Sequence, residues 1–335
     1  MNDFMQGLVD RASATPCRVA LSEAQSPDVL RLAQRIVECG IGTPVLVGDE
    51  AASRAVASEA GADLAGAEYV DLASEDVVAG IAERYCARFD DFSPKAAMRR
   101  AKDPLLCSML LLKLGEVDCV AAGKECPTGE VVAAAMGIVG LAQGVESPSS
   151  LGIAQIPGFE GPQGEFLGLA DCAITVWPTA EELAGIAIAS ADTARDLLGW
   201  EPRVAMLAFS TKGSAEHETI DVVRAATERV HELRPDIACD GELQLDAAII
   251  PAVAEHKVKG ESPVAGRANI LIFPNIHAGN IGVKLVQIFG HANAYGPVLQ
   301  GFAKPVCDFS RSAPVDEMLG NVAMLAIRAA AGKEA

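Results

Sequence analysis

The chain has 335 residues, of which half are apolar and 21% are charged. This length is typical of two domains, and the apolar content excludes a chain that is disordered for lack of a core. The formal net charge of −18 argues against binding to nucleic acid or to an anionic membrane surface, because both need a basic footprint. An anionic ligand would need a locally positive pocket.

The cysteines, the histidines and the apolar segments indicate the compartment. No apolar stretch reaches the roughly 18 to 20 residues that span a bilayer, and the N-terminus lacks the basic segment and apolar core of a secretory signal. The nine cysteines include no C-x-x-C pair, and the five histidines include no H-E-x-x-H motif. We therefore expect a cytoplasmic protein with free thiols, no membrane span and no metal site.

Short β-branched or apolar segments alternate with helical patterns, which is typical of an α/β fold with a mainly parallel sheet. The first strand is predicted at residues 18–21. Ser26 and Pro27 then supply an N-cap and a first residue for a helix that ends at Gly40. Further strands are predicted at residues 44–47, 117–121, 204–209, 269–273 and 296–299.

Two more segments in the middle of the chain have residues that indicate their local structure. Thr179 and Glu182 have the spacing of a capping box, which predicts a helix from there to about Gly199. Residues 147–168 are rich in Ser, Pro and Gly. They are expected to form a loop, either where the chain crosses between domains or in a hairpin.

Several nucleotide-binding and hydrolase motifs are absent. Residues 40–42 contain two glycines but follow a helix and lack the third glycine of a dinucleotide-binding turn, and no G-x-x-x-x-G-K-[ST] segment occurs. No G-x-S-x-G segment occurs either, which argues against a serine hydrolase of the α/β type.

Two loops have residues that suit an anion. The segment STKGS at 210–214 follows a predicted strand and precedes a helix, and its hydroxyl groups, glycine and lysine could bind a phosphate. An ordinary turn with a serine N-cap explains the same residues equally well. The small-residue segment 278–284 places Lys284 one turn into a helix, which is a weaker signal.

Taken in order, these and neighbouring segments resemble the phosphate acetyltransferase family, with its related phosphate butyryltransferases. The resemblance covers almost the whole chain, although it is weak over the first 145 residues. The segments that carry it are ADCA (170–173), AEELA (180–184), PRVAML (202–207), STKGS (210–214), DGELQLD (240–246), GNIG (279–282), GPVLQG (296–301), KPV (304–306) and DFSR (308–311).

The resemblance implies a reversible transfer of an acyl group between coenzyme A and inorganic phosphate, without a metal and without a covalent acyl-enzyme. Coenzyme A, acyl phosphate and phosphate would be substrates, and no cofactor would be tightly bound. It also implies two α/β domains in the fold of the isocitrate dehydrogenases. Residues 1–145 and 300–335 would form the first domain and residues 146–299 an inserted second one, with the active site in the cleft between them and a homodimer as the unit.

The family's S-R motif falls on Ser310 and Arg311. By resemblance, Ser310 stabilises the oxyanion and Arg311 binds phosphate. The family's general base is an aspartate seven residues beyond the serine, which here is Glu317, with Asp316 one position earlier. Neighbouring helical residues point about 100° apart, so only one of the two acids can face the site. Carboxylates in a first helical turn also complement the helix dipole, so the choice stays open.

The chain departs from the family at several positions. The arginine of the family's T-x-x-T-x-R pattern falls on Ala133, with Thr128 at the start of the pattern. Lys124 stands where the family has a small residue, and it either replaces the missing charge or is an exposed surface lysine. The family's L-P-E-G-E-x-P-R is here LSEAQSPD, so Asp28 stands in place of its last arginine.

Arg88, in a Y-x-x-R-like context, is either a family substrate-binding residue or an exposed helix residue. The predicted substrate-binding set is completed by residues of the two anion-suited loops. The whole set is Arg311, Arg88, Lys284, Asn280, Ser210, Thr211, Lys212, Gly213, Ser214, Thr128 and Lys124.

Other functions stay open beside transfer of an acetyl group. The acyl group could be propionyl or butyryl, or a larger chain carried to another acceptor. The chain could also be a non-catalytic protein that binds CoA or acyl phosphate, although the retained Ser310 and Arg311 argue against this. A dehydrogenase with the same fold is disfavoured, because the sequence shows no convincing cluster of metal-binding aspartates.

Overall fold

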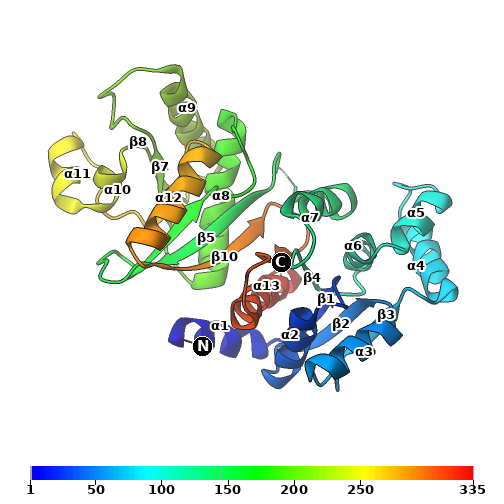
Figure 1. Ribbon diagram of the computed structural model, residues 1–335. Helices are drawn as coiled ribbons and strands as arrows, with labels where there is room; N and C mark the ends of the chain where they lie inside the picture. The colour runs from blue at the N-terminus through cyan, green and yellow to red at the C-terminus, as the bar shows by residue number, and fades with distance from the viewer. Residues whose placement is uncertain (1, 144, 335) are drawn as a thin grey trace. The chain divides into compact units, whose positions relative to one another are not determined.

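The computed structural model describes residues 2–143 and 145–334 and shows an α/β protein with two mainly parallel sheets (Figure 1). The chain divides into two compact units. The first comprises Met1–Ala142 and Phe302–Ala335, and the second comprises Gln143–Gly301. The second unit is thus inserted in sequence between the two segments of the first. The expected α/β fold class is confirmed.

The first unit contains a five-stranded parallel sheet in the order β11-β4-β1-β2-β3. Its strands are β1 (Cys17–Leu21), β2 (Gly42–Gly48), β3 (Glu68–Asp71), β4 (Cys119–Ala122) and β11 (Val306–Asp308). Its helices are α1 (Asp3–Ser13), α2 (Pro27–Glu38), α3 (Glu50–Ala60), α4 (Glu75–Arg88), α5 (Pro94–Ala101), α6 (Pro104–Leu114), α7 (Thr128–Ala134), the π-helical turn η1 (Ala135–Val139) and α13 (Val315–Glu334).

The central strands of this sheet are buried, as is usual for parallel strands covered on both faces by helices. All four residues of β4 are buried, and so are Val19, Ala20 and Leu21 of β1. Parallel pairing brings the carboxyl ends of β1, β4 and β11 to one edge of the sheet. The loops that follow these three strands therefore lie beside one another, at the edge where α/β sheets usually bind ligands.

The second unit contains a six-stranded mixed sheet in the order β10-β5-β6-β9-β7-β8, in which only the pairs β10–β5 and β5–β6 are antiparallel. Its strands are β5 (Ser149–Gln155), β6 (Phe166–Ala170), β7 (Arg203–Leu207), β8 (Ala238–Leu243), β9 (Ile270–Ile272) and β10 (Asn293–Gln300). Its helices are α8 (Ala180–Leu198), α9 (Glu218–Leu233), α10 (Leu245–Ile249), α11 (Pro251–Lys257) and α12 (Ile276–Phe289).

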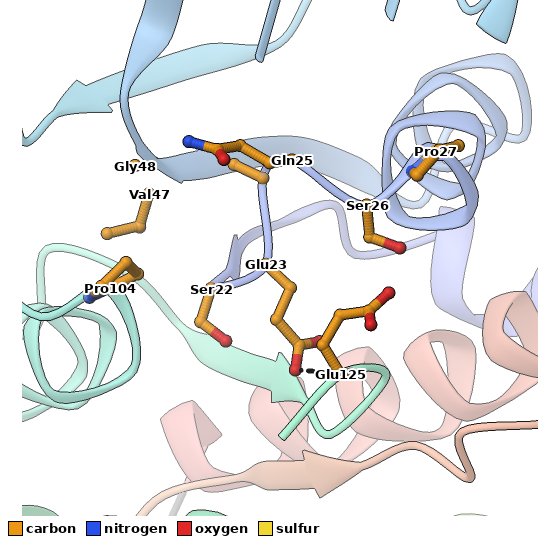
Figure 2. A pocket seen from close by; sticks show the side chains of 10 residues that line it. Ser22, Glu23, Gln25, Ser26, Pro27, Val47, Gly48, Pro104 and Glu125 are labelled. Carbon is orange, nitrogen blue, oxygen red and sulfur yellow. Dashed lines mark hydrogen bonds between the residues drawn. The ribbon is translucent and has the colours of Figure 1, made fainter. Parts of the chain in front are cut away.

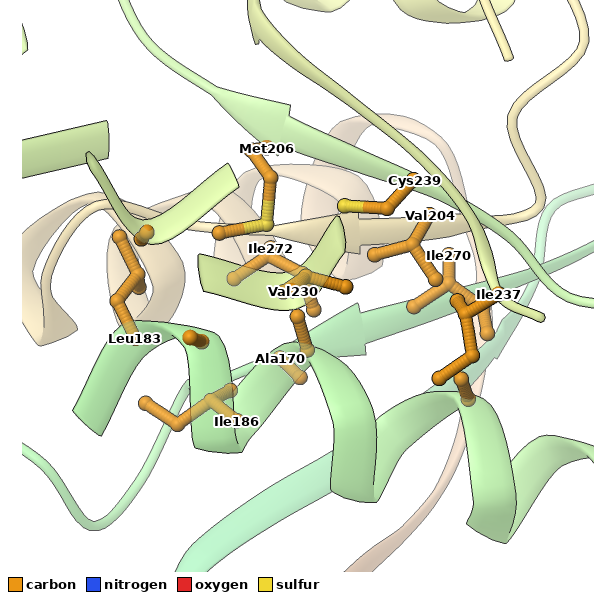
Figure 3. Packing of buried hydrophobic residues seen from close by; sticks show 14 of the residues in the cluster. Ala170, Leu183, Ile186, Val204, Met206, Val230, Ile237, Cys239, Ile270 and Ile272 are labelled. Atoms are coloured by element: carbon orange, nitrogen blue, oxygen red, sulfur yellow. The ribbon is translucent and has the colours of Figure 1, made fainter. Parts of the chain in front are cut away.

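A core of the second unit lies between α8, α9 and one face of this sheet (Figure 3). Leu183 and Ile186 of α8 and Val230 of α9 pack against Met206 of β7 and Ile270 of β9, all nearly inaccessible to solvent. Apolar residues at helical spacing on α8 and α9 and at alternate positions on β7 produce this packing.

All six predicted strands are confirmed, with ends that differ by a few residues. The capping box at Thr179 and Glu182 is present, and α8 ends at Gly199 in the left-handed conformation. Residues 147–168, expected to be a loop, contain β5 and the start of β6, which pair as an antiparallel hairpin. The hairpin interpretation is therefore right, and the loop is confined to its tip.

Within residues 2–143 and 145–334, no helix is both long enough and apolar enough to cross a bilayer.

Candidate active site

Glu23, in the loop after β1, fixes the loop that follows β4. Its carboxylate accepts hydrogen bonds from four successive backbone N–H groups at N···O distances of 3.2, 2.9, 2.9 and 3.0 Å, those of Gly123, Lys124, Glu125 and Cys126. Figure 2 shows the Glu23 side chain directed toward Glu125. Both side chains line a hollow of about 450 Å³. A carboxylate held by several N–H groups is strongly fixed, so residues 123–128 have a defined conformation.

Asp308, the last residue of β11, lies against the same loop. It is buried, and the Thr128 hydroxyl donates to its Oδ2 at 2.6 Å. Gly123 lets the two segments approach, since a Cβ atom there would lie 2.1 Å from Asp308 Oδ1. The Thr128 hydroxyl predicted to bind substrate is therefore engaged with Asp308.

The environment of Asp308 makes it a weak acid. Burial raises its pKa to about 6, and Glu23 acts in the same direction, against the Thr128 hydrogen bond and the Arg311 charge, which lower it. Its Oδ1 atom has no hydrogen-bond partner within the described ranges 2–143 and 145–334. Sequence reasoning assigned Asp308 no role, although it stands two residues before Ser310.

Ser310 and Arg311 follow β11 and are exposed. The Ser310 hydroxyl lies 3.1 Å from the Ser312 hydroxyl, and the Arg311 guanidinium acts on Asp308. Both predicted groups are thus accessible to a ligand at the carboxyl edge of the sheet.

The two acids at the start of α13 have different environments. Glu317 is half-buried, and burial raises its pKa while the Lys124 ammonium opposes the rise. Asp316 is exposed. A half-buried carboxylate with a raised pKa suits a general base, so Glu317 stays the predicted base.

Lys124 is not the exposed surface lysine that the sequence allowed. Its side chain is only 10% exposed, and its Nζ lies 3.0 Å from Asp28 Oδ2. The same Nζ donates to the Ala313 carbonyl at 2.8 Å. This side chain thus joins the loop after β4 to the start of α2 and to the turn after Ser310.

Arg88 lies away from these residues. Its Nη1 donates to the carbonyl of Leu114, the last residue of α6, at 2.7 Å. Leu114 precedes β4, so this contact is at the amino edge of the sheet. Arg88 is exposed at the end of α4, which agrees with the second of its two sequence interpretations, an exposed helix residue; a role in binding substrate stays a prediction.

Ala133 lies on α7 beside cations that the sequence analysis did not single out. It lines a hollow of about 380 Å³ together with Arg99 and Arg100 of α5, and Asp103 and Glu130 also line it. Whether a side chain from α5 lies near residue 133 depends on how α5 and α7 pack, which no local motif indicates.

In the second unit, the hydrogen-bond donors of the 210–214 loop contact acceptors that belong to the chain itself. Ser210 Oγ and the Gly213 N–H donate to Glu242 Oε1 at 2.9 and 2.8 Å. Lys212 Nζ contacts the Asp240 carboxylate and donates to the Gly241 carbonyl at 2.8 Å.

The other hydroxyl groups of this loop are engaged in the same way. The Thr211 hydroxyl donates to Gln244, and the Ser214 hydroxyl accepts from the Thr211 N–H. The loop is therefore closed on internal acceptors, because β8 brings two buried carboxylates to it, and its role in binding an anion stays a prediction.

Replacing Glu242 by Gln is expected to lower the free energy of unfolding by about 3 kcal/mol, since the Glu242 side chain is 3% exposed and its ion pair with Arg224 would be broken. Denaturant unfolding at pH 7 measures this. Asp221→Asn is the matched control, because Asp221 pairs with the same arginine at 71% exposure and should change stability by less than about 0.5 kcal/mol. Equal effects of the two substitutions would contradict the prediction.

Glu242 should also make the free energy of unfolding depend on pH. Burial alone would raise the pKa of Glu242, but hydrogen bonds from Arg224, Gly213 and Ser210 lower it to about 2 from an ordinary 4.5. Its stabilisation is therefore complete above the ordinary value and is lost as the pH falls toward 2. Unfolding of Glu242→Gln should lack this part of the acid dependence.

On α12, Asn280 Nδ2 donates to the Cys172 carbonyl at 3.2 Å, and Lys284 is exposed. Gly279 permits this contact, since a Cβ atom there would lie 2.3 Å from the Asp171 carbonyl oxygen. Across the described part of the chain, no three His, Cys, Asp or Glu side chains are gathered as a metal ion would require.

The chain is similar to known acyltransferases along its whole length. It is 43% identical over 334 residues to the phosphate acetyltransferase of Thermoanaerobacterium thermosaccharolyticum, covering 97% of this chain and 99% of that protein. It is 39% identical over 336 residues to that of Clostridium acetobutylicum, covering 98% and 99%.

Solved structures and family membership agree with this similarity. A phosphotransacetylase from Streptococcus pyogenes superposes with a TM-score of 0.89 at 31% identity, covering 99% of this chain and all of that one. Residues 3–327 match the family described as phosphate acetyl/butaryl transferase. The chain therefore belongs to the phosphate acetyl/butaryl transferase family.

Proposed function

We propose that the protein is a phosphate acetyltransferase, which interconverts acetyl-CoA and phosphate with acetyl phosphate and CoA. The observation that carries this proposal is the exposed Ser310–Arg311 pair, with the half-buried Glu317 seven residues beyond the serine, in a chain 43% identical to a protein of that name. Coenzyme A is a substrate here and not a tightly bound cofactor.

The chemistry assigns one task to each of the three side chains. In the direction of acetyl-CoA synthesis, Glu317 takes the proton of the CoA thiol, because an ordinary thiol is only a few per cent ionised at neutral pH. The thiolate sulfur bonds to the acetyl carbon, and the bond from that carbon to the phosphate oxygen breaks. Ser310 donates to the carbonyl oxygen while it bears negative charge, and Arg311 binds the leaving phosphate.

Direct transfer can be tested by initial-rate kinetics. Because no covalent acyl-enzyme is formed, CoA and acetyl phosphate must be bound together. Double-reciprocal plots with CoA varied at several acetyl phosphate concentrations should then intersect. Parallel lines would indicate a covalent intermediate and contradict direct transfer.

A second candidate is transfer of propionyl or butyryl groups. It is favoured by the family description, which includes butyryl transfer, and by Ala133, which stands where the T-x-x-T-x-R pattern has an arginine. The test compares kcat/KM for acetyl-, propionyl- and butyryl-CoA with phosphate. One extra methylene in a pocket changes kcat/KM by roughly tenfold or more, so the series identifies the preferred substrate.

We also propose a homodimer. Helix α12 exposes Ile281, Leu285, Ile288 and Phe289, with Phe289 76% exposed. Their spacing places them on one side of the helix, and a large exposed apolar patch typically marks an interface. Sedimentation should give twice the chain mass of 34.8 kDa. A monomer at micromolar concentration would contradict this assignment.

The proposed enzyme acts in acetate metabolism in the cytoplasm, where the nine cysteines stay reduced. Lys284 and Asn280 keep a proposed role in binding substrate, with Asn280 held in place by the Cys172 carbonyl.

A further inference from the structure

The side chain of Lys124 is held in an unusual way for a lysine. Lysine side chains usually extend into water, because the stem is flexible and the ammonium is costly to bury. Here the side chain is 10% exposed and its Nζ has two fixed partners, the Ala313 carbonyl at 2.8 Å and Asp28 at 3.0 Å. Its backbone N–H is also fixed, by the Glu23 carboxylate at 2.9 Å.

These contacts place the ammonium at the turn between Ser310 and α13. Ala313 lies in the turn between Ser310 and α13, and Glu317 follows on the first turn of that helix. The Lys124 ammonium is the charge that acts on Glu317, whereas the Arg311 guanidinium acts on Asp308. Asp28, 38% exposed at the start of α2, binds the other side of the ammonium.

We propose that Lys124 is a positioning residue of the reaction: it fixes the turn that carries Ser310 and keeps an ammonium group beside the Glu317 carboxylate, so that this carboxylate is ionised when the CoA thiol arrives. The inference rests on the proposed function.

The electrostatic part of this role has a definite sign. Burial favours the protonated form of Glu317, which cannot take a proton, and a nearby cation favours the ionised form. Asp28 offsets part of the ammonium charge. Removing Lys124 should therefore raise the pKa of Glu317, and removing the charge of Asp28 should lower it.

The test is the pH profile of kcat for formation of acetyl-CoA from CoA and acetyl phosphate, the direction in which Glu317 acts as the base. The acid limb of this profile reports the ionisation of the base in the complex. Lys124→Met should move this limb to higher pH, by about one unit. Asp28→Asn should move it in the opposite direction. Lys124→Arg keeps the charge and should leave the limb near its wild-type position.

A purely structural role of Lys124 predicts different results. If Lys124→Met lowers the rate equally at every pH, the inference is overturned. Should that variant fail to fold, the Asp28→Asn profile decides, and an unmoved limb there also overturns the inference. If Glu317→Gln keeps the acid limb, the limb belongs to another group and the assignment to Lys124 fails.

The proposed function can fail separately from this inference. A wild-type protein that releases no thiol from acyl-CoA with phosphate would contradict the function itself. If the wild-type protein turns over but neither Lys124→Met nor Asp28→Asn moves the acid limb, only the role of Lys124 is contradicted.

Discussion

Ser310→Ala is expected to lower kcat about 100-fold and to leave KM nearly unchanged. The hydroxyl has its effect on the oxyanion, which exists only in the transition state, so its loss should not weaken substrate binding. Steady-state kinetics with acetyl-CoA and phosphate measures both parameters. The hydroxyl is exposed after β11 and its hydrogen-bond contact is with Ser312, so its removal should not disturb folding.

Ser312→Ala is the matched control for this prediction. Its hydroxyl lies 3.1 Å from that of Ser310 on the same turn, but it is not assigned to the oxyanion. We expect a loss of only a few-fold. If Ser310→Ala keeps the wild-type kcat, or if both alanine variants lose activity equally, Ser310 does not have the proposed role.

Glu317→Gln should lower kcat by at least roughly 10², in the range typical of a lost general base, while Asp316→Asn should retain most of the activity. Glutamine keeps the shape of the half-buried side chain but cannot take up a proton from the thiol. The two acids are adjacent in sequence, so the pair separates the role of the base from the general negative charge at the start of α13.

The pH dependence provides an independent check on Glu317. Because burial raises its pKa, the wild-type rate of acetyl-CoA formation from CoA and acetyl phosphate should fall as the pH drops through that raised value. Glu317→Gln should have lost this limb. A larger loss in Asp316→Asn than in Glu317→Gln would reverse the assignment, and two fully active variants would show that the base lies elsewhere.

Elements with strong local signals could be predicted from the sequence. The Ser26–Pro27 start of α2, the capping box of α8 and the apolar strand β1 are determined by residues within a few positions of one another. Strand β8 could not be predicted in this way, because it contains Asp240 and Glu242. Those two carboxylates are buried only because Lys212 and Arg224, from other elements, neutralise them.

The site residues also divide into those that the local sequence indicates and those that depend on distant contacts. Ser310, Arg311 and Glu317 came from a motif, and their roles stay predictions. Glu23 and Asp308 were missed, although each stands at or just after the carboxyl end of a predicted or observed strand. Their importance depends on contacts with residues 123–128, about 100 and 180 positions away, which only the parallel pairing of β1, β4 and β11 brings together.

For two of the predicted substrate-binding segments, the sequence left a structural alternative open that depends on distant contacts. The 210–214 loop has the composition of an anion site, but its donors contact Glu242 and Asp240, about 30 residues later. Arg88 follows a motif-like context, but its guanidinium donates to the carbonyl of Leu114, which precedes β4. Composition identifies which groups can bind an anion, whereas the fold decides whether they are still available.

The most direct test of the whole account is to incubate the purified protein with acetyl-CoA and to measure free thiol and acetyl phosphate together, with and without phosphate. The account predicts that both products appear in equal amounts, that neither appears without phosphate, and that Ser310→Ala slows both about 100-fold. Thiol release that needs no phosphate, or no release from any short acyl-CoA, would contradict it.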